Sequence, residues 1–254
     1  MMWAARPRSD SNDRCLLIMD AIKAANLAVA KTAIVSLQQA SDPGGFRLAL
    51  RSATNFDCAD PELEHDSIFA EAGRRGLARD LAVGLVEYAC RDAHVVPQGK
   101  RPIYFVHVPI AIVADPRFQA DLERTVEAMG LDRARLCLEI QENRFSEGFS
   151  VSGLHQLVHR GFLLSLAGFG TGMACFAALK CFPLSYVQVA PSFVSEFLTD
   201  PISRELVRAS IEIAHLTGRR SIASGVDSHE CISTLLSLGA DYVEGPGVQT
   251  APRH

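Results

Sequence analysis

The segment from residue 162 to residue 191, FLLSLAGFGTGMACFAALKCFPLSYVQVAP, constrains the fold of this chain more than any other. It holds two short apolar runs, residues 162–166 and 186–189. A glycine-rich turn, FGTG at residues 169–172, and a helix-length segment that ends at Pro183 lie between the two runs. A strand, a glycine turn, a helix and a second strand in this order are typical of a βαβ unit.

The same alternation extends along most of the chain. Strand-like apolar runs separated by segments with helical spacing occur at residues 103–110, 136–141, 162–166, 186–189, 221–226 and 242–248. Such a series predicts a parallel sheet, and this many units in one domain favour a closed barrel. Two earlier runs, residues 32–37 and 46–53, flank the turn SDPGG and predict an antiparallel hairpin. We therefore expect an α/β fold, a TIM-like (β/α)8 barrel with one antiparallel strand near the N-terminus.

Length and local pattern indicate a single domain. The 254 residues are enough for one large barrel. Residues 1–13, MMWAARPRSDSND, are polar and have no period, which predicts a flexible tail. Residues 14–254 are expected to form the barrel domain, beginning with a helix at residues 14–31.

Composition excludes several classes of function. A net charge of −4 is unlike the basic surface of a nucleic-acid-binding protein. No apolar run reaches the length of a membrane span, and the N-terminal segment lacks the apolar core of a signal peptide. The seven cysteines contain no C-x-x-C pair, so we interpret them as reduced, mostly buried thiols. We expect a cytoplasmic protein without nucleic-acid or membrane partners.

Several short motifs support a more specific interpretation. In chain order they are F-G-T-G at residues 169–172, the proline of an L-P turn at Pro183, S-F-V at 192–194, A-x-L-T-G at 214–218 and L-x-x-L-G-A-D at 235–241. Their order and spacing, from about Thr32 to Pro252, closely resemble the EAL family of bacterial cyclic di-GMP phosphodiesterase domains. The resemblance implies a barrel of the EAL type.

The strand-end positions of that family are only partly kept. Where the family has E-A-L-L-R, this chain has RLALR, so Arg47 replaces the metal-binding glutamate and Arg51 retains the arginine that contacts the dinucleotide phosphate. His107 replaces a metal-binding asparagine. Glu139 and Glu142 match both glutamates of the family's L-E-L-T-E.

The later chemical positions are replaced. Ala167 and Gly168 stand where the family has two aspartates, and Gln188 stands at the lysine of L-K-I-D. Ser224 takes the place of the first glutamate of A-E-G-V-E, and Glu244 takes the place of the glutamine of Q-G-Y.

These replacements predict that hydrolysis is lost. The family's reaction resembles two-metal phosphodiester hydrolysis, in which divalent cations need several oxygen ligands. Of the matching metal positions, only Glu139 keeps a suitable carboxylate. Arg47 reverses the local charge, and each charge–charge interaction is about 4 kcal/mol at about 4 Å and an effective dielectric near 20. Loss of a general base alone costs about a hundred- to ten-thousand-fold in rate. We expect no metal, no cofactor and no catalytic residue.

Several retained or altered residues are candidates for other roles. Arg47 only offsets the carboxylate charge of Glu139 and Glu142, or pairs with Glu139 and holds the barrel mouth together without metal, or donates to a phosphate directly. His107 is expected to be a hydrogen-bonded strand-end histidine, with metal ligation as the alternative. The candidate ligand-binding set is Arg51, Arg47, Glu139, Phe169, Gly170, Gln188 and Glu244. Glu142 and Asp227 are interpreted as loop-holding residues. The FGTG turn is expected to serve loop geometry or dimer packing.

Two hypotheses about function follow from the resemblance. The first is a catalytically inactive regulatory module that docks on a protein partner, such as a regulator of transcription, motility or biofilm formation. The second is a non-hydrolysing cyclic di-GMP receptor that uses Arg51, Phe169 and Arg47. A third, residual phosphodiesterase activity, needs rearranged metal ligands. Since the carboxylate of Glu244 would repel an anionic ligand, we favour the first hypothesis. The family also implies a homodimer.

Overall fold

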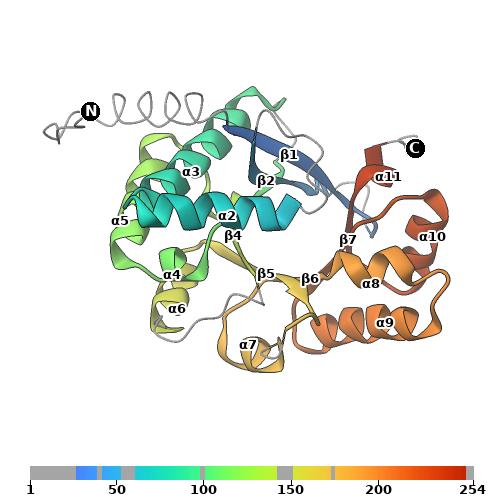
Figure 1. Ribbon diagram of the computed structural model, residues 1–254. Helices are drawn as coiled ribbons and strands as arrows, with labels where there is room; N and C mark the ends of the chain where they lie inside the picture. Colours follow the sequence, from blue (N-terminus) through green and yellow to red (C-terminus); the bar gives the residue numbers. More distant parts are fainter. Residues whose placement is uncertain are drawn as a thin grey trace, which may run out of the picture.

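A computed structural model describes residues 27–38, 42–52, 61–97, 101–141, 151–172 and 175–249 of the chain. Eight strands form a closed barrel in sequence order (Figure 1). They are β1 (Leu27–Ser36), β2 (Gly45–Ser52), β3 (Ile103–His107), β4 (Leu136–Gln141), β5 (Leu163–Phe169), β6 (Tyr186–Val189), β7 (Arg220–Ser224) and β8 (Tyr242–Glu244). Strand β1 runs antiparallel to both β2 and β8, and all other neighbours are parallel. The predicted α/β barrel with one antiparallel strand is confirmed.

Helices surround this barrel (Figure 1). In chain order they are α2 (Pro61–Arg74), α3 (Ala78–Val95), α4 (Ile110–Val113), α5 (Pro116–Ala128), the 3-10 helix η1 (Arg133–Arg135), α6 (Val151–His159), α7 (Cys175–Cys181), α8 (Pro191–Glu196), α9 (Pro201–Leu216), α10 (His229–Ser237) and α11 (Pro246–Gln249). Helix α5 begins as its sequence predicts, because the Asp115 carboxylate accepts a hydrogen bond from Arg117 N and Pro116 occupies the first turn. Within the described segments, no helix is both long and apolar enough to cross a membrane.

Several predicted boundaries were wrong. Strand β1 begins at Leu27, inside the predicted helix at residues 14–31, because this segment pairs with β2 from Leu27 opposite Ser52 onward. Residues 1–26, with the rest of that helix and the predicted tail, lie outside the described residues. Strand β3 ends before Pro109, which caps α4, and β8 stops at Glu244, where Gly245 has a φ of 148°.

The strands alternate between two apolar environments. Outward-facing residues such as Leu138, Leu164 and Val187 join the main core beneath the surrounding helices. The inward-facing residues form a separate apolar layer inside the barrel: Ile34, Phe105, Cys137, Tyr186, Ile222 and Tyr242. This inner layer fixes which residues face the barrel axis further along each strand.

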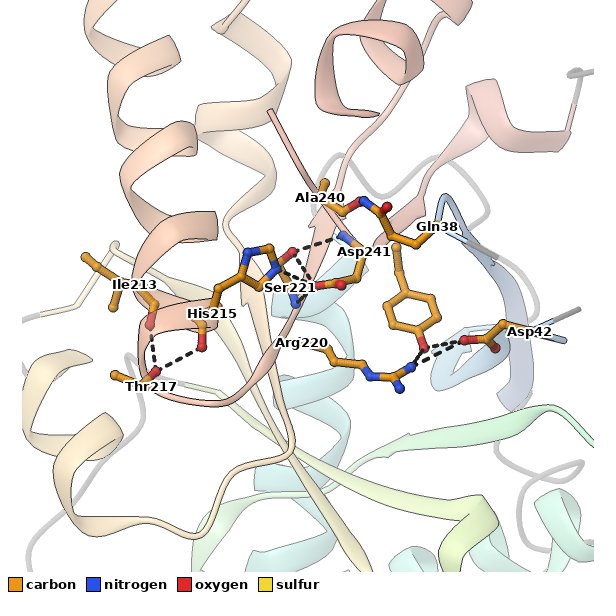
Figure 2. Close-up of polar contacts among 11 residues, drawn as sticks. Gln38, Asp42, Ile213, His215, Thr217, Arg220, Ser221, Ala240 and Asp241 are labelled. Carbon is orange, nitrogen blue, oxygen red and sulfur yellow. Dashed lines mark hydrogen bonds and ion pairs between the residues drawn. The ribbon is translucent and has the colours of Figure 1, made fainter. Parts of the chain in front are cut away.

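A half-buried carboxylate connects the N-terminal ends of β7 and β8. Figure 2 shows Asp241, whose Oδ2 accepts hydrogen bonds from Ser221 N at 2.8 Å, Ser221 Oγ at 3.0 Å and His215 Nε2 at 2.7 Å. Asp241 N donates to Ser221 Oγ at 3.1 Å. The Ser221 side chain is fully buried, so the serine, aspartate and histidine act here as a structural clasp.

Replacing Ser221 with alanine is expected to lower the free energy of unfolding by about 1–2 kcal/mol, because two hydrogen bonds of the clasp are lost. Urea unfolding followed by circular dichroism measures the change. The matched control is Ser195→Ala, at an exposed serine that bonds only its own helix turn, with an expected change within about 0.5 kcal/mol. Equal stability of the two variants would contradict the clasp.

Candidate functional site

A polar layer fills the barrel at the C-terminal ends of its strands. Because side chains alternate along a strand, the residues two positions beyond the inner apolar layer also face the axis. We call the resulting set the mouth layer: Arg47, His107, Glu139, Gln188, Ser224 and Glu244. Apart from Arg47, all of these residues are buried. The strand pattern thus brings together the candidates that the sequence placed on separate strands.

Arg47 joins two carboxylates within the mouth layer. Its Nη2 atom donates to Glu139 Oε2 at 2.8 Å, and its Nη1 atom lies 3.0 Å from Glu244 Oε2. The side chains of Arg47, Glu139 and Glu244 are 11%, 1% and 7% exposed, so all three charges are largely removed from water. Buried charges are tolerated when they are paired and hydrogen-bonded. The predicted pairing of Arg47 with Glu139 is confirmed.

The structure corrects the role expected for Glu244. This carboxylate is not an isolated negative charge that would repel an anion, because Arg47 pairs with it and Ser224 Oγ donates to its Oε2 at 3.0 Å. Gln188 Nε2 contacts Ser224 Oγ in turn. A continuous polar chain therefore runs from β6 through β7 and β8 to β2.

Two buried polar atoms beside this chain lack hydrogen-bond partners among the described residues. They are Gln188 Oε1 and Ser165 Oγ, and both side chains are fully buried. A buried polar atom without a partner is costly, and it is commonly satisfied by water or by a ligand. Nothing in the sequence distinguished Ser165 from the apolar residues around it.

A histidine pair borders the layer at β3. The rings of His65 and His107 are stacked with centroids 4.4 Å apart. His65 Nδ1 accepts a hydrogen bond from Leu50 N at 2.8 Å, so Nε2 carries the proton and donates to His107 O at 3.1 Å. Burial lowers the pKa of His65 to about 4. His107 Nε2 lies 3.9 Å from Asp66 Oδ1, which is too long for a hydrogen bond, so the hydrogen-bonded role expected for the His107 side chain stays a prediction.

Phe169 does not face the mouth, and its predicted ligand role was wrong. The ring is 3% exposed, lies in the core beneath the helices and meets Phe176 edge to face at 6.4 Å. The pairing of β5 with β6 shifts register between Leu166 and Phe169, so the irregularity changes the face on which residue 169 lies.

Gly170 is required by local geometry. Its φ is +98°, and a Cβ atom at this position would lie 2.8 Å from Cε2 of Phe193. Thr171 closes the turn by donating from N and Oγ1 to Gly168 O at 3.2 and 2.7 Å. These contacts support the interpretation of the FGTG turn as loop geometry.

Three predicted residues contribute less to the described site. The backbone of Arg51 pairs with Ala28 near the end of β2, and its side chain lies outside the described part of the structure. Glu142 also lies outside it. Asp227 is exposed in the loop after β7, where its backbone packs closely against Gly247.

The mouth layer does not fit a divalent cation. No group of three or more histidine, cysteine, aspartate or glutamate side chains suited to a metal occurs within the segments that the structure describes. A guanidinium occupies the space between the two carboxylates that face the axis. Magnesium and manganese need several oxygen ligands, and the two carboxylates that face the axis are already paired with Arg47.

The described cysteines carry no redox or nucleophilic arrangement. Cys90, Cys137, Cys181 and Cys231 are free thiols. Three are buried, and burial raises the pKa of Cys90 to about 12 and that of Cys231 to about 11. A thiol with a raised pKa is a poor nucleophile, so the three buried cysteines, Cys90, Cys137 and Cys231, serve as small core residues.

A protein-family model and several curated proteins match this chain. The model of the EAL domain matches residues 45–251. Cyclic di-GMP phosphodiesterase PdeL of Escherichia coli (strain K12) is 27% identical over 130 residues, which are 50% of this chain and 36% of that protein. The chain spans between 21% and 36% of the length of the first curated relatives that it matches.

Solved structures share the fold. The EAL enzyme Bd1971, in its form with cAMP and cyclic di-GMP bound, has a TM-score of 0.76 at 22% identity, covering 92% of this chain and 65% of that one. The FimX EAL domain from Pseudomonas aeruginosa bound to cyclic di-GMP has a TM-score of 0.73 at 21% identity, covering 94% and 97%. With the family model matched over most of its length, the chain belongs to the EAL domain family.

Proposed function

We propose that this chain is a catalytically silent EAL domain that acts in cyclic di-GMP-related signalling through contacts with other proteins. The observation that carries the proposal is the position of Arg47 between the carboxylates of Glu139 and Glu244. A guanidinium there supplies fixed positive charge without a metal, but it holds no hydroxide nucleophile. In metal-dependent phosphodiester hydrolysis, a pair of metal ions supplies the positive charge that stabilises the reacting phosphate. Here Arg47 carries the positive charge, and its ion pairs hold barrel strands together instead.

The neighbouring positions support the loss of hydrolysis. Ala167 and Gly168 offer no side-chain oxygen for a metal. Ser224 and Gln188 are hydrogen-bonded to each other and carry no charge, so they replace neither a general base nor a cationic lysine. The protein partner would be a regulator of transcription, motility or biofilm formation, and a homodimer is part of the proposal.

A second function is favoured by a separate observation. Gln188 Oε1 and Ser165 Oγ are buried polar atoms without a partner in the described residues, and they lie at the barrel mouth. Solved EAL domains of the same fold carry cyclic di-GMP, the FimX domain among them. The alternative is therefore a receptor that binds cyclic di-GMP at the mouth, with Arg51 contacting phosphate, and does not cleave it.

One experiment separates these functions. The purified chain is incubated with cyclic di-GMP and magnesium or manganese, and linear pGpG is measured by chromatography. We expect no product above the blank, and metal-dependent pGpG formation would refute catalytic silence. Isothermal titration with cyclic di-GMP follows, with and without magnesium. Metal-independent binding that is lost in Arg51→Ala and kept in the exposed control Arg117→Ala would replace the first function with the receptor. If the folded protein gives no heat of binding with cyclic di-GMP, the receptor function is excluded and the first function, contact with other proteins, remains.

A further inference from the structure

A cavity lies at the opposite end of the barrel from the mouth layer. It has a volume of about 540 Å³ and is lined by residues at the N-terminal ends of the strands. We call it the floor cavity, and its chemically distinct lining residues are Arg101, Arg220, Tyr186, Tyr242, Leu163 and Leu184. Its volume falls in the range of about 300–1,000 Å³ that is usual for small-molecule sites.

The two tyrosines of the floor cavity differ in how their hydroxyls are satisfied. Tyr242 donates to Asp42 Oδ2 at 2.7 Å and contacts Nη1 of Arg220. Tyr186 is 6% exposed, and its ring meets those of Phe105 and Tyr242, whereas its hydroxyl makes no hydrogen bond to another described residue. The hydroxyl is not fully shielded from solvent, and Tyr186 lines the cavity, so this hydroxyl can donate to whatever occupies the cavity.

The charges around the floor cavity are predominantly positive. Arg101 is exposed and forms no ion pair within the described residues. Arg220 lies 3.4 Å from Asp42 Oδ2, which is a long contact for an ion pair. The Asp42 carboxylate is further occupied by Gly44 N at 2.9 Å and by Tyr242. The cavity lining thus carries two guanidinium groups and one carboxylate, and that carboxylate is already hydrogen-bonded.

Part of the wall is apolar. Ile103, Leu163 and Leu184 line it together with Ala134. Apolar walls with a few convergent polar groups are typical of sites that orient a small organic ligand. Guanidinium groups are suited to carboxylates and phosphates, because their planar donors match two oxygens at once.

We infer that the floor cavity is a binding site for a small organic anion. Its anionic group is held by Arg101 and Arg220 and accepts a hydrogen bond from the Tyr186 hydroxyl, and its apolar body packs on Leu163 and Leu184. This inference does not depend on the proposed function of the mouth, because the two sites use different residues at opposite ends of the strands.

The inference is tested with the full chain and phenyl phosphate as the probe. Binding is followed by isothermal titration and by saturation-transfer NMR of the phenyl protons. We expect phenyl phosphate to bind more tightly than inorganic phosphate, which lacks the apolar body, and benzamidine, which carries the opposite charge, not to bind. Tyr186→Phe and Arg101→Gln should each weaken binding by about tenfold or more, since each removes a hydrogen bond to a charged group.

The variants separate binding from folding. The ring of Tyr186 meets Phe105 at 5.0 Å, and phenylalanine keeps this contact. Since the hydroxyl has no partner in the described chain, Tyr186→Phe should leave the melting temperature unchanged. Arg117→Gln, at an exposed arginine on α5, is the charge control and should bind phenyl phosphate as the unaltered chain does. Undetectable binding of phenyl phosphate, equal binding by all variants, or inorganic phosphate binding as tightly as phenyl phosphate would overturn the inference.

Discussion

Replacing Arg47 with methionine is expected to lower the free energy of unfolding by about 3–5 kcal/mol, because it leaves two buried carboxylates without their cation. Glu139 and Glu244 are 1% and 7% exposed in their side chains, so water cannot take over the role of the guanidinium. Methionine has a similar length, which keeps the loss of packing small. Urea unfolding at pH 7, followed by circular dichroism, measures the change.

The cause is isolated by neutralising the carboxylates as well. In the triple variant Arg47→Met, Glu139→Gln, Glu244→Gln no buried charge lacks a partner, so we expect most of the lost stability to return. Arg117→Met is the matched control, at an exposed arginine, and should change stability by less than about 0.5 kcal/mol. A triple variant as unstable as Arg47→Met alone would show that the ion pairs do not determine the loss.

The same residues show how far the sequence alone could lead. The positions of β4 and β6 follow from their mainly apolar runs, since a strand buried on both faces is predominantly apolar. The motif order placed Arg47 and Glu139 on strands whose ends meet in a barrel, which made their pairing predictable. Both inferences rest on regular periodicity along a strand.

The unpredicted features arise where that periodicity breaks or where distant segments meet. The irregular pairing between Leu166 and Phe169 reversed the face of Phe169, and Gly168, with a φ of 69°, is a local sign of the irregularity that the sequence analysis did not use. The contact of Arg47 with Glu244 depends on closure of the barrel, which brings together residues from opposite ends of the chain. His65 reaches the mouth only because α2 packs on β2 and β3, so its helix sequence carries no sign of the role.

His65 makes the stability of the fold sensitive to acid. Its pKa is about 4 in the folded protein, against about 6.5 for an exposed histidine, because burial disfavours the charged ring. The unfolded chain therefore binds a proton at a higher pH than the folded chain does. The stabilising contribution is complete above pH 6.5 and is lost as the pH falls toward 4. We expect the contribution of His65 to the free energy of unfolding to fall by about 2 kcal/mol between pH 7 and pH 5. The full loss, reached below pH 4, is about 3 kcal/mol.

The measurement is the free energy of unfolding in urea at pH 7, 6 and 5, for the unaltered chain and for His65→Gln. Glutamine does not titrate, so the variant should be less stable at pH 7, where it loses the contact with Leu50 N, and its stability should fall less steeply with acid. His155→Gln, at an exposed histidine that bonds Cys181 O, is the control and should keep the slope of the unaltered chain. The ring of His107 stacks on that of His65, and Asp66 lies near His107, but both residues remain in all three proteins. The difference in slope between the unaltered chain and His65→Gln therefore reports His65 itself, and parallel curves would show that its burial does not control acid stability.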